Sequence, residues 1–295
     1  MVPHVRLGTR GSALALAQAA LVADALGAAE IVEVRGVRSP NGGGDKARFV
    51  RGIEDALLAG EVDLGVHSAK DIPSDLPDEL RLVGVSVRED PADAYVGPAG
   101  SLDEVPEGTR VGTSSLRRRA QLLAIRPDLE VEDLRGNVDT RLGRLAAGEL
   151  EAVVLAAAGL RRLDREQEIA FRFDAEAMTP AAGQGALALE ARRGDESSAA
   201  AAAGISDTTA LVELTAERAA IAELEASCQT PVGVRAELRD GRLRADAFVG
   251  LPDGSEWVRD TLEGNPADPA SLGRELAERL RSAGARELLD RAEEM

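Results

Sequence analysis

The sequence predicts an α/β protein of two lobes followed by a small α+β domain. Three observations lead to this prediction. Strand-like and helix-like segments alternate up to about residue 206, two strand–turn–helix segments resemble each other, and a long helical segment with short strands follows. Such alternation is typical of mainly parallel sheets covered by helices. A length of 295 residues favours two or three domains over a single core.

The first lobe begins with a strand that runs into a helix. VRLGTRG (5–11) is predicted as a strand that ends in glycine, and SALALAQAALVADALG (12–27) as a helix with Ser12 as its N-cap. The other segments expected here are the strands EIVEVRGV (30–37), VDLGVHSAKD (62–71) and LRLVGVSV (80–87), the glycine-rich loop NGGGDKARF (41–49) and the helix FVRGIEDALLAG (49–60).

The second lobe repeats the beginning of the first. GTRGSALALAQ and GTSSLRRRAQL are both a strand end, a Gly-Thr turn, a serine and a helix that reaches Gln. DPADAYVGPAG (90–100) is expected to cross from the first lobe, and TPAAGQGALALEAR (179–192) to return to it as a late strand. The segments between them are the strands TRVGTSS (109–115), LEVEDLRG (129–136) and EAVVLAAAG (151–159), and the helices SLRRRAQLLAIRP (115–127) and NVDTRLGRLAAGEL (137–150).

The last part of the chain is predicted as a separate α+β domain. DTTALVELTAERAAIAELEAS (207–227) has the pattern of one amphipathic helix, and two helices are expected at about 270–283 and 285–294. Between them, three antiparallel strands are joined at Asp240-Gly241 and Asp253-Gly254. We place the first lobe at 1–88 plus about 183–205, the second at 92–180 and the C-terminal domain at 208–295.

Composition narrows the classes of function. The formal charge of −17 and an aromatic content of 2% argue against a nucleic-acid partner, which needs a basic footprint and stacking platforms. No apolar run reaches the roughly 18 residues of a membrane span, and the N-terminus lacks the pattern of a secretory signal. We therefore expect a cytoplasmic protein without a membrane partner. Its acidic surface, with Lys46 and Lys70 as the only lysines, suits a high-salt cytoplasm.

Arginines at the starts of helices are the unusual feature of this acidic chain. Ser114 or Ser115 is expected to cap a helix whose first turn carries Arg117 and Arg118. Cations there cost a few tenths to about 1 kcal/mol each unless an anion accompanies them, because a helix N-terminus is itself positive. The segments around Arg10, Arg135 and Arg141 repeat this design at other strand-to-helix turns.

Two partners for these arginines remain open. With 52 Asp and Glu in the chain, a guanidinium pairs readily with a carboxylate of the protein itself. The alternative is a ligand with several carboxylates or phosphates, held in a cleft between the lobes, because the planar fork of Arg donates two parallel hydrogen bonds to such groups. The placement of the arginines beside strand-to-helix turns favours the ligand.

Other reactive side chains give weaker signals. Lys70 and Asp71 follow a hydrophobic strand, where a carboxylate among cations stays ionised and can relay a proton. His67 is predicted to pack within that strand. Cys228 lies in a polar loop, where either a buried structural role or an accessible thiol is open. With 2 His and 1 Cys the chain has no usual zinc site and no disulfide framework, and we expect no metal.

Nine segments, in this order, resemble the porphobilinogen deaminase (hydroxymethylbilane synthase) family: GTRGSALALAQ, VHSAKDIP, REDPADA, GTSSLRRRAQL, LRGNVDTRL, LAAAGLRRL, PAAGQGAL, LTAERA and CQTPVG. The resemblance implies a transferase of haem biosynthesis that condenses four porphobilinogen molecules head to tail, with loss of ammonia, into hydroxymethylbilane. It also implies two lobes like those of periplasmic binding proteins, a cysteine-bearing α+β domain, and a monomer.

The resemblance assigns roles by motif match. It implies a dipyrromethane cofactor on Cys228, attached by a thioether bond, and a catalytic Asp71 that helps to protonate the departing amine and stabilises positive charge on pyrrole nitrogens. The implied cofactor-binding residues are Cys228, Lys70, Ser115, Arg117 and Arg118, and the implied substrate carboxylate-binding residues are Arg10, Ser12, Thr113, Ser114, Arg135, Arg141 and Arg162.

Two positions depart from the family pattern, and a rival interpretation remains. KARF (46–49) stands where Lys-Gly-x-Phe is common, which leaves the role of the 41–49 loop unassigned. Ser227 replaces a glycine before the cysteine, which leaves the chemistry of Cys228 intact. The rival is a non-catalytic polycarboxylate-binding protein on the same two-lobed fold, which needs the arginines but neither Asp71 nor Cys228.

Overall fold

The computed structural model describes residues 5–35, 45–227 and 229–295, with the backbone alone described for 45–49. The chain forms two compact units, Met1–Glu89 with Ala186–Leu211, and Asp90–Gly185 with Val212–Met295. The division of the second unit into a lobe and a C-terminal domain stays a prediction.

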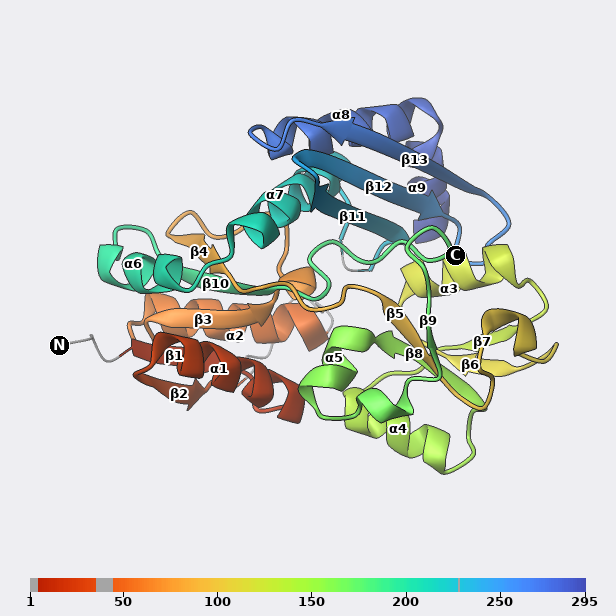
Figure 1. Ribbon diagram of the computed structural model, residues 1–295, viewed down its shortest axis with the longest axis horizontal. Helices are drawn as coiled ribbons and strands as arrows, with labels where there is room; N and C mark the ends of the chain where they lie inside the picture. The colour runs from red at the N-terminus through yellow and green to blue at the C-terminus, as the bar shows by residue number, and fades with distance from the viewer. Residues whose placement is uncertain (1–4, 36–44, 228) are drawn as a thin grey trace. The chain divides into compact units, whose positions relative to one another are not determined.

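The first unit is built on a five-stranded sheet in the order β2-β1-β3-β10-β4 (Figure 1). β1, β2 and β3 are parallel, whereas β10 runs antiparallel to both of its neighbours. The late strand therefore returns to the first sheet, as predicted. The strands are β1 (Val5–Thr9), β2 (Ala29–Glu33), β3 (Leu64–Ser68), β4 (Leu80–Val85) and β10 (Leu187–Arg192).

Helices cover both faces of this sheet. α1 (Ala13–Leu26) and α6 (Glu196–Gly204) pack on one face through Val22 and Ala202. α2 (Asp45–Leu58) packs on the other face, where Ile53 and Leu57 approach Gly65 of β3. The expected loop over 41–49 is wrong for 45–49, which already belong to α2, and 41–44 lie outside the described residues.

The second unit contains a sheet of the same design, in the order β7-β6-β8-β5-β9. β6, β7 and β8 are parallel, and β5 runs antiparallel to β8 and β9. α3 covers one face of this sheet, and α4 and α5 the other. The elements are β5 (Asp93–Val96), β6 (Arg110–Gly112), β7 (Glu130–Glu132), β8 (Ala152–Ala156), β9 (Phe171–Arg172), α3 (Leu116–Ile125), α4 (Val138–Ala146) and α5 (Ala157–Arg162).

The two sheets share a strand order that includes one antiparallel strand, which the alternation of strands and helices in the sequence did not predict. In each sheet four strands run in one direction and one runs against them, and this strand is the last in sequence in the first sheet (β10) and the first in the second (β5). The segment expected only to cross between lobes therefore contains β5, and the sheets are mixed rather than wholly parallel. The two α/β lobes of the predicted fold class are confirmed.

The C-terminal part of the second unit is an antiparallel sheet in the order β11-β12-β13, one face of which packs on α7, α8 and α9. Asp240 and Gly241 both have positive φ, 52° and 75°, as a tight two-residue hairpin turn requires. The predicted small α+β arrangement is confirmed. Its elements are β11 (Val232–Arg239), β12 (Arg242–Gly250), β13 (Trp257–Gly264), α7 (Thr208–Glu223), α8 (Pro269–Ser282) and α9 (Ala285–Glu293).

Gly254→Ala is expected to destabilise the second unit. Gly254 has a φ of +74°, and a Cβ there would lie 2.4 Å from the backbone nitrogen of Ala124 in α3. Because a backbone atom cannot shift without strain, we expect the free energy of unfolding to fall by about 2–4 kcal/mol.

Gly241→Ala is the matched control. Its φ is +75°, but no atom lies within 4 Å of the added Cβ. Only the left-handed conformation is then penalised, by about 1 kcal/mol. Urea unfolding measures both variants, and equal losses would show that the close approach to α3 does not matter.

Candidate active site

The predicted residues of the first unit meet at one edge of its sheet. Arg10 and Ser12 follow β1, and Lys70 and Asp71 follow β3, its parallel neighbour. Ser12 caps α1 by accepting a hydrogen bond from the backbone of Ala15 at 3.3 Å. These carboxyl ends of adjacent parallel strands are where ligands of open α/β sheets bind.

The segment that carries Asp71 is held by its backbone and by α1. It forms one short 3-10 turn, Ala69–Asp71. The backbone N–H of Ala69 donates to the carbonyl of Ala186 at 3.0 Å. Just before the turn, Ser68 and the side-chain amide of Gln18 are joined by hydrogen bonds of 3.0 and 3.1 Å. Lys70 and Asp71 remain partly exposed on this fixed backbone.

His67 packs inside the sheet, as predicted. Its Nε2 lies 3.0 Å from Oε2 of Glu190 on β10, and both side chains are buried. Glu54 of α2 is buried nearby, and its pKa is raised first by burial and then by the charge of Glu190. This group belongs to the packing between the sheet and α2 rather than to the edge that bears Asp71.

In the second unit, one carboxylate binds both helix-start arginines. Asp93, at the first position of β5, is completely buried. Arg117 donates to its two oxygens through Nη1 at 2.6 Å and Nη2 at 3.2 Å, and Arg118 donates through Nε at 2.7 Å. Gln184 adds a fourth hydrogen bond at 3.0 Å. Arg117 and Arg118 are themselves only 3% and 5% exposed.

The electrostatics of this cluster keep Asp93 ionised. Complete burial alone would raise the pKa of its carboxyl, but the charges of Arg117 and Arg118 and the hydrogen bonds from Arg117 and Gln184 outweigh burial. The pKa is therefore held well below its usual range. The protein carboxylate that the sequence left open as a partner is thus present for both arginines.

The other predicted residues follow β6, β7 and β8 in the sequence. Ser114 and Ser115 directly precede α3, Arg141 lies in α4, and Arg162 is the last residue of α5. Ser115, rather than Ser114, caps α3 by accepting from the backbone of Arg118 at 3.4 Å. Ser114 instead accepts from Nη2 of Arg141 at 2.9 Å. Arg162 donates to the carbonyl of Gly185 at 2.6 Å.

Two further predicted residues, Thr113 and Arg135, differ in their burial. Thr113 is 3% exposed, and its hydroxyl accepts from the backbone of Ser115 at 3.2 Å. Arg135 is almost fully exposed, and it pairs with Asp133 at 2.9 Å. Cys228 lies outside the described residues.

Sequence reasoning assigned no role to Asp93, Thr179 or Gln184. Asp93 stands within DPADAYVGPAG, which was expected only to cross between the lobes, and Thr179 and Gln184 stand within TPAAGQGALALEAR, which was expected only to return as a late strand. A signal for Asp93 was present, because an acid that begins the apolar stretch DAYV is costly to bury without a cation. No local signal marks Thr179, which contributes its backbone carbonyl.

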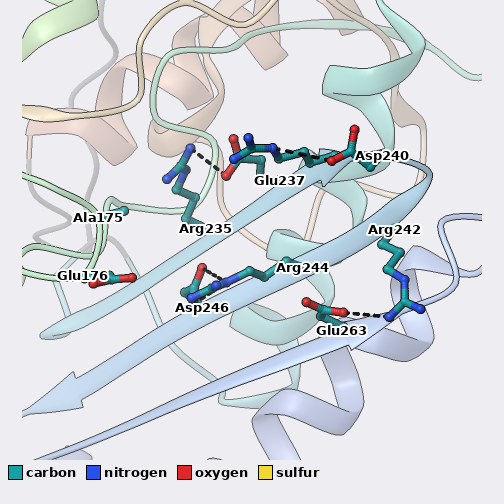
Figure 2. A pocket seen from close by; sticks show the side chains of 10 residues that line it. Ala175, Glu176, Arg235, Glu237, Asp240, Arg242, Arg244, Asp246 and Glu263 are labelled. Atoms are coloured by element: carbon teal, nitrogen blue, oxygen red, sulfur yellow. Dashed lines mark hydrogen bonds and ion pairs between the residues drawn. The ribbon is translucent and has the colours of Figure 1, made fainter.

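The described residues offer no metal-binding group, and a hollow elsewhere in the second unit is lined by paired charges. Within the described ranges, no group of three or more His, Cys, Asp or Glu is placed to hold a metal ion. A hollow of about 350 Å³ lies over the C-terminal sheet, where Figure 2 shows charged residues that pair with one another. Examples are Arg244 with Asp246 at 2.8 Å and Arg242 with Glu263 at 3.1 Å.

Sequence comparisons place the chain in a family. The family model described as "Porphobilinogen deaminase, dipyromethane cofactor binding domain" matches residues 5–200, and the "Porphobilinogen deaminase, C-terminal domain" matches 211–282. The porphobilinogen deaminase of Roseiflexus castenholzii is 46% identical over 96% of this chain and 97% of its own. That of Deinococcus radiodurans is 42% identical over 98% of this chain and 99% of its own.

Among solved structures, the BvgS VFT2 domain of Bordetella pertussis is similar, with 18% identity and a TM-score of 0.40 over 69% of this chain and 86% of that one. The chain belongs to the porphobilinogen deaminase family, whose members are transferases of tetrapyrrole synthesis. No helix in the described residues is long and apolar enough to cross a membrane.

Asp93→Asn is expected to destabilise the protein at neutral pH by about 3–5 kcal/mol, because it leaves two buried guanidinium groups without their carboxylate. The folded pKa of Asp93 lies below the unfolded value near 3.9, so its contribution is complete above about pH 4 and is lost as the pH falls further. The difference between wild type and variant should therefore shrink in acid.

Denaturant unfolding at several pH values measures this difference. Asp133→Asn is the control, because its pair with Arg135 is exposed on both sides and should contribute less than about 1 kcal/mol. A difference that stays constant as the pH is lowered would show that the ionised carboxylate is not what stabilises the cluster.

Proposed function

We propose that this chain joins four porphobilinogen molecules head to tail, releasing ammonia, to form hydroxymethylbilane. Family membership over both matched domains supports the reaction. The assignment of particular residues rests on one observation, which is that these residues occupy similar positions in the two sheets. The predicted residues that the structure describes follow carboxyl ends of parallel strands, as binding sites of α/β sheets do.

The available donors fit a cofactor that bears carboxylates. Each pyrrole ring of dipyrromethane carries an acetate and a propionate, and the candidate residues offer hydroxyl groups and guanidinium forks, which donate to such oxygens. We assign Lys70, Ser115, Arg117 and Arg118 to hold the cofactor, with Cys228 as its thioether anchor. When bound, dipyrromethane supplies the pyrrole ring to which the first substrate unit is joined.

Arg117 and Arg118 are suited to this task by their rigidity. Their guanidinium groups are set in place by Asp93 and by the carbonyls of Thr179 and Val154, which accept from them at 2.8 and 2.9 Å. Side chains that are already ordered lose little freedom when a ligand arrives. Arg10, Ser12, Thr113, Ser114, Arg135, Arg141 and Arg162 are assigned to the carboxylates of the growing chain.

Asp71 is assigned to the chemistry. In this role its carboxylate relays a proton to the departing amine and stabilises positive charge on a pyrrole nitrogen. The short 3-10 turn Ala69–Asp71 places the backbone of Asp71 directly after β3, which supports this assignment. A non-catalytic polycarboxylate binder needs neither Asp71 nor Cys228, and the family match does not favour it.

We also propose that the protein works as a cytoplasmic monomer without a nucleic-acid or membrane partner. The formal charge of −17 supports this, since nucleic acids and anionic membrane surfaces would repel such a surface. The same charge suits a high-salt cytoplasm.

Asp71→Asn and Cys228→Ser separate the enzyme from a plain binder. Intact mass spectrometry should find an added dipyrrole on wild type and on Asp71→Asn, and none on Cys228→Ser. Turnover of Asp71→Asn should fall by about 100-fold or more, because a positioned proton-transfer group contributes 10²–10⁴-fold. An unmodified wild-type mass, or normal turnover of Asp71→Asn, would contradict the proposal.

A further inference from the structure

A connecting segment, residues 175–185, is fastened to the C-terminal sheet of the second unit. The backbone of Val234 in β11 donates to the carbonyl of Pro180 at 2.9 Å. The buried carboxylate of Glu217 accepts from the backbone of Gly183 at 2.6 Å and from that of Ala236 at 2.8 Å. Strand β11 and the connecting segment are therefore joined at two points, directly at Val234 and through the Glu217 carboxylate at Ala236.

The same segment orients the arginine pair. The carbonyl of Thr179 accepts from Nη1 of Arg117 at 2.8 Å, and the side chain of Gln184 donates to Asp93 at 3.0 Å. Gly233 of β11 packs directly on this point, since a Cβ there would lie 2.5 Å from the Thr179 carbonyl oxygen and 3.2 Å from Cδ of Arg117. Gly233 is five positions after Cys228 in the sequence.

Arg259 of β13 reaches the connecting segment from the sheet. Its Nη2 donates to the carbonyl of Ala177 at 2.9 Å, and its Nη1 donates to the carbonyl of Glu176. The guanidinium lies over the rings of Phe248 and Trp257, 5.1 and 5.7 Å from their centroids. Two aromatic rings and the peptide carbonyls thus fix this one side chain.

Gln121 connects Arg259 to Arg117 through hydrogen bonds to Arg259 and to Thr179. It lies one turn after Arg117 on α3 and is completely buried. Its Oε1 accepts from Nη2 of Arg259 at 3.0 Å and from the backbone of Thr179 at 2.7 Å. Its Nε2 donates to the Thr179 carbonyl at 3.0 Å, the same oxygen that Arg117 uses.

We propose that Arg259 is a positioning residue for Arg117: through Gln121 and Thr179 it holds the cofactor-binding guanidinium in register with the sheet that follows Cys228. This inference rests on the proposed function of Arg117. The role needs the planar fork of Arg, because a lysine ammonium at the same position cannot serve the separate acceptors at Glu176, Ala177 and Gln121 together.

The test measures kcat/KM for porphobilinogen in Arg259→Gln, Arg259→Lys, Arg117→Lys and the double variant Arg259→Gln/Arg117→Lys. We expect Arg259→Gln and Arg259→Lys each to lower kcat/KM by about tenfold, since small misplacements of positioning groups cost up to about 10²-fold. Added to Arg117→Lys, Arg259→Gln should cause no further loss, because Arg259 acts only through Arg117.

Arg242→Gln is the matched control. Arg242 belongs to the same sheet, is 77% exposed and pairs with Glu263, as Figure 2 shows. It should leave kcat/KM unchanged. Thermal melting shows whether each variant is folded at the assay temperature. If Arg259→Gln is unfolded there, Arg259→Lys replaces it in the comparison.

The outcomes separate this inference from the proposed function. If Arg117→Lys keeps wild-type kcat/KM, the assigned role of Arg117 fails. If Arg117→Lys is impaired while Arg259→Gln and Arg259→Lys are normal, or while the two losses multiply in the double variant, the positioning role of Arg259 is overturned and that of Arg117 stands.

Discussion

The buried carboxylate of Asp93 joins the start of β5 to the start of α3 in the second unit. Asp93 accepts from Arg117, Arg118 and Gln184, groups that come from α3 and from the segment leading into β10. Both arginines lie in the first helical turn, where the helix dipole disfavours cations, and both are nearly inaccessible to water. Without the carboxylate, burial of two guanidinium groups would be prohibitive. The start of β5 and the start of α3 are therefore fixed to each other.

This constraint gives the arginines a defined geometry before any ligand binds. A flexible surface Arg must be ordered on binding, whereas Arg117 and Arg118 are already held by Asp93 and by the carbonyls of Thr179 and Val154. For the proposed role of holding the cofactor, fixed donors are an advantage, because they need no further ordering when it binds. The connecting segment extends this rigidity to the sheet that follows Cys228, through Arg259 and Gln121.

Local chemistry was predictable from the sequence, and long-range pairing was not. The cap Ser12 and the Asp240-Gly241 turn follow from residue type and spacing, and the structure has them. For the cap of α3 the sequence left Ser114 and Ser115 open, and the structure has Ser115. β5 was missed because Pro91 and Pro98 flank it and suggest a connection. The partnership of Asp93 with Arg118 spans 25 residues and depends on the order of strands, and that of Gln121 with Arg259 spans 138. No local pattern encodes such contacts, although an unpaired acid in an apolar strand is a usable warning.

Carbon-13 NMR of the Asp93 carboxyl measures whether this group is ionised in the folded protein. The resonance can be assigned by its loss in Asp93→Asn and followed in Cys228→Ser protein, which the account expects to be free of cofactor. If two guanidinium groups hold this carboxylate in the folded protein, its shift should remain at the ionised value as the pH is lowered to about 4, near the ordinary Asp pKa. Half-titration at that pH in the folded protein would contradict the account.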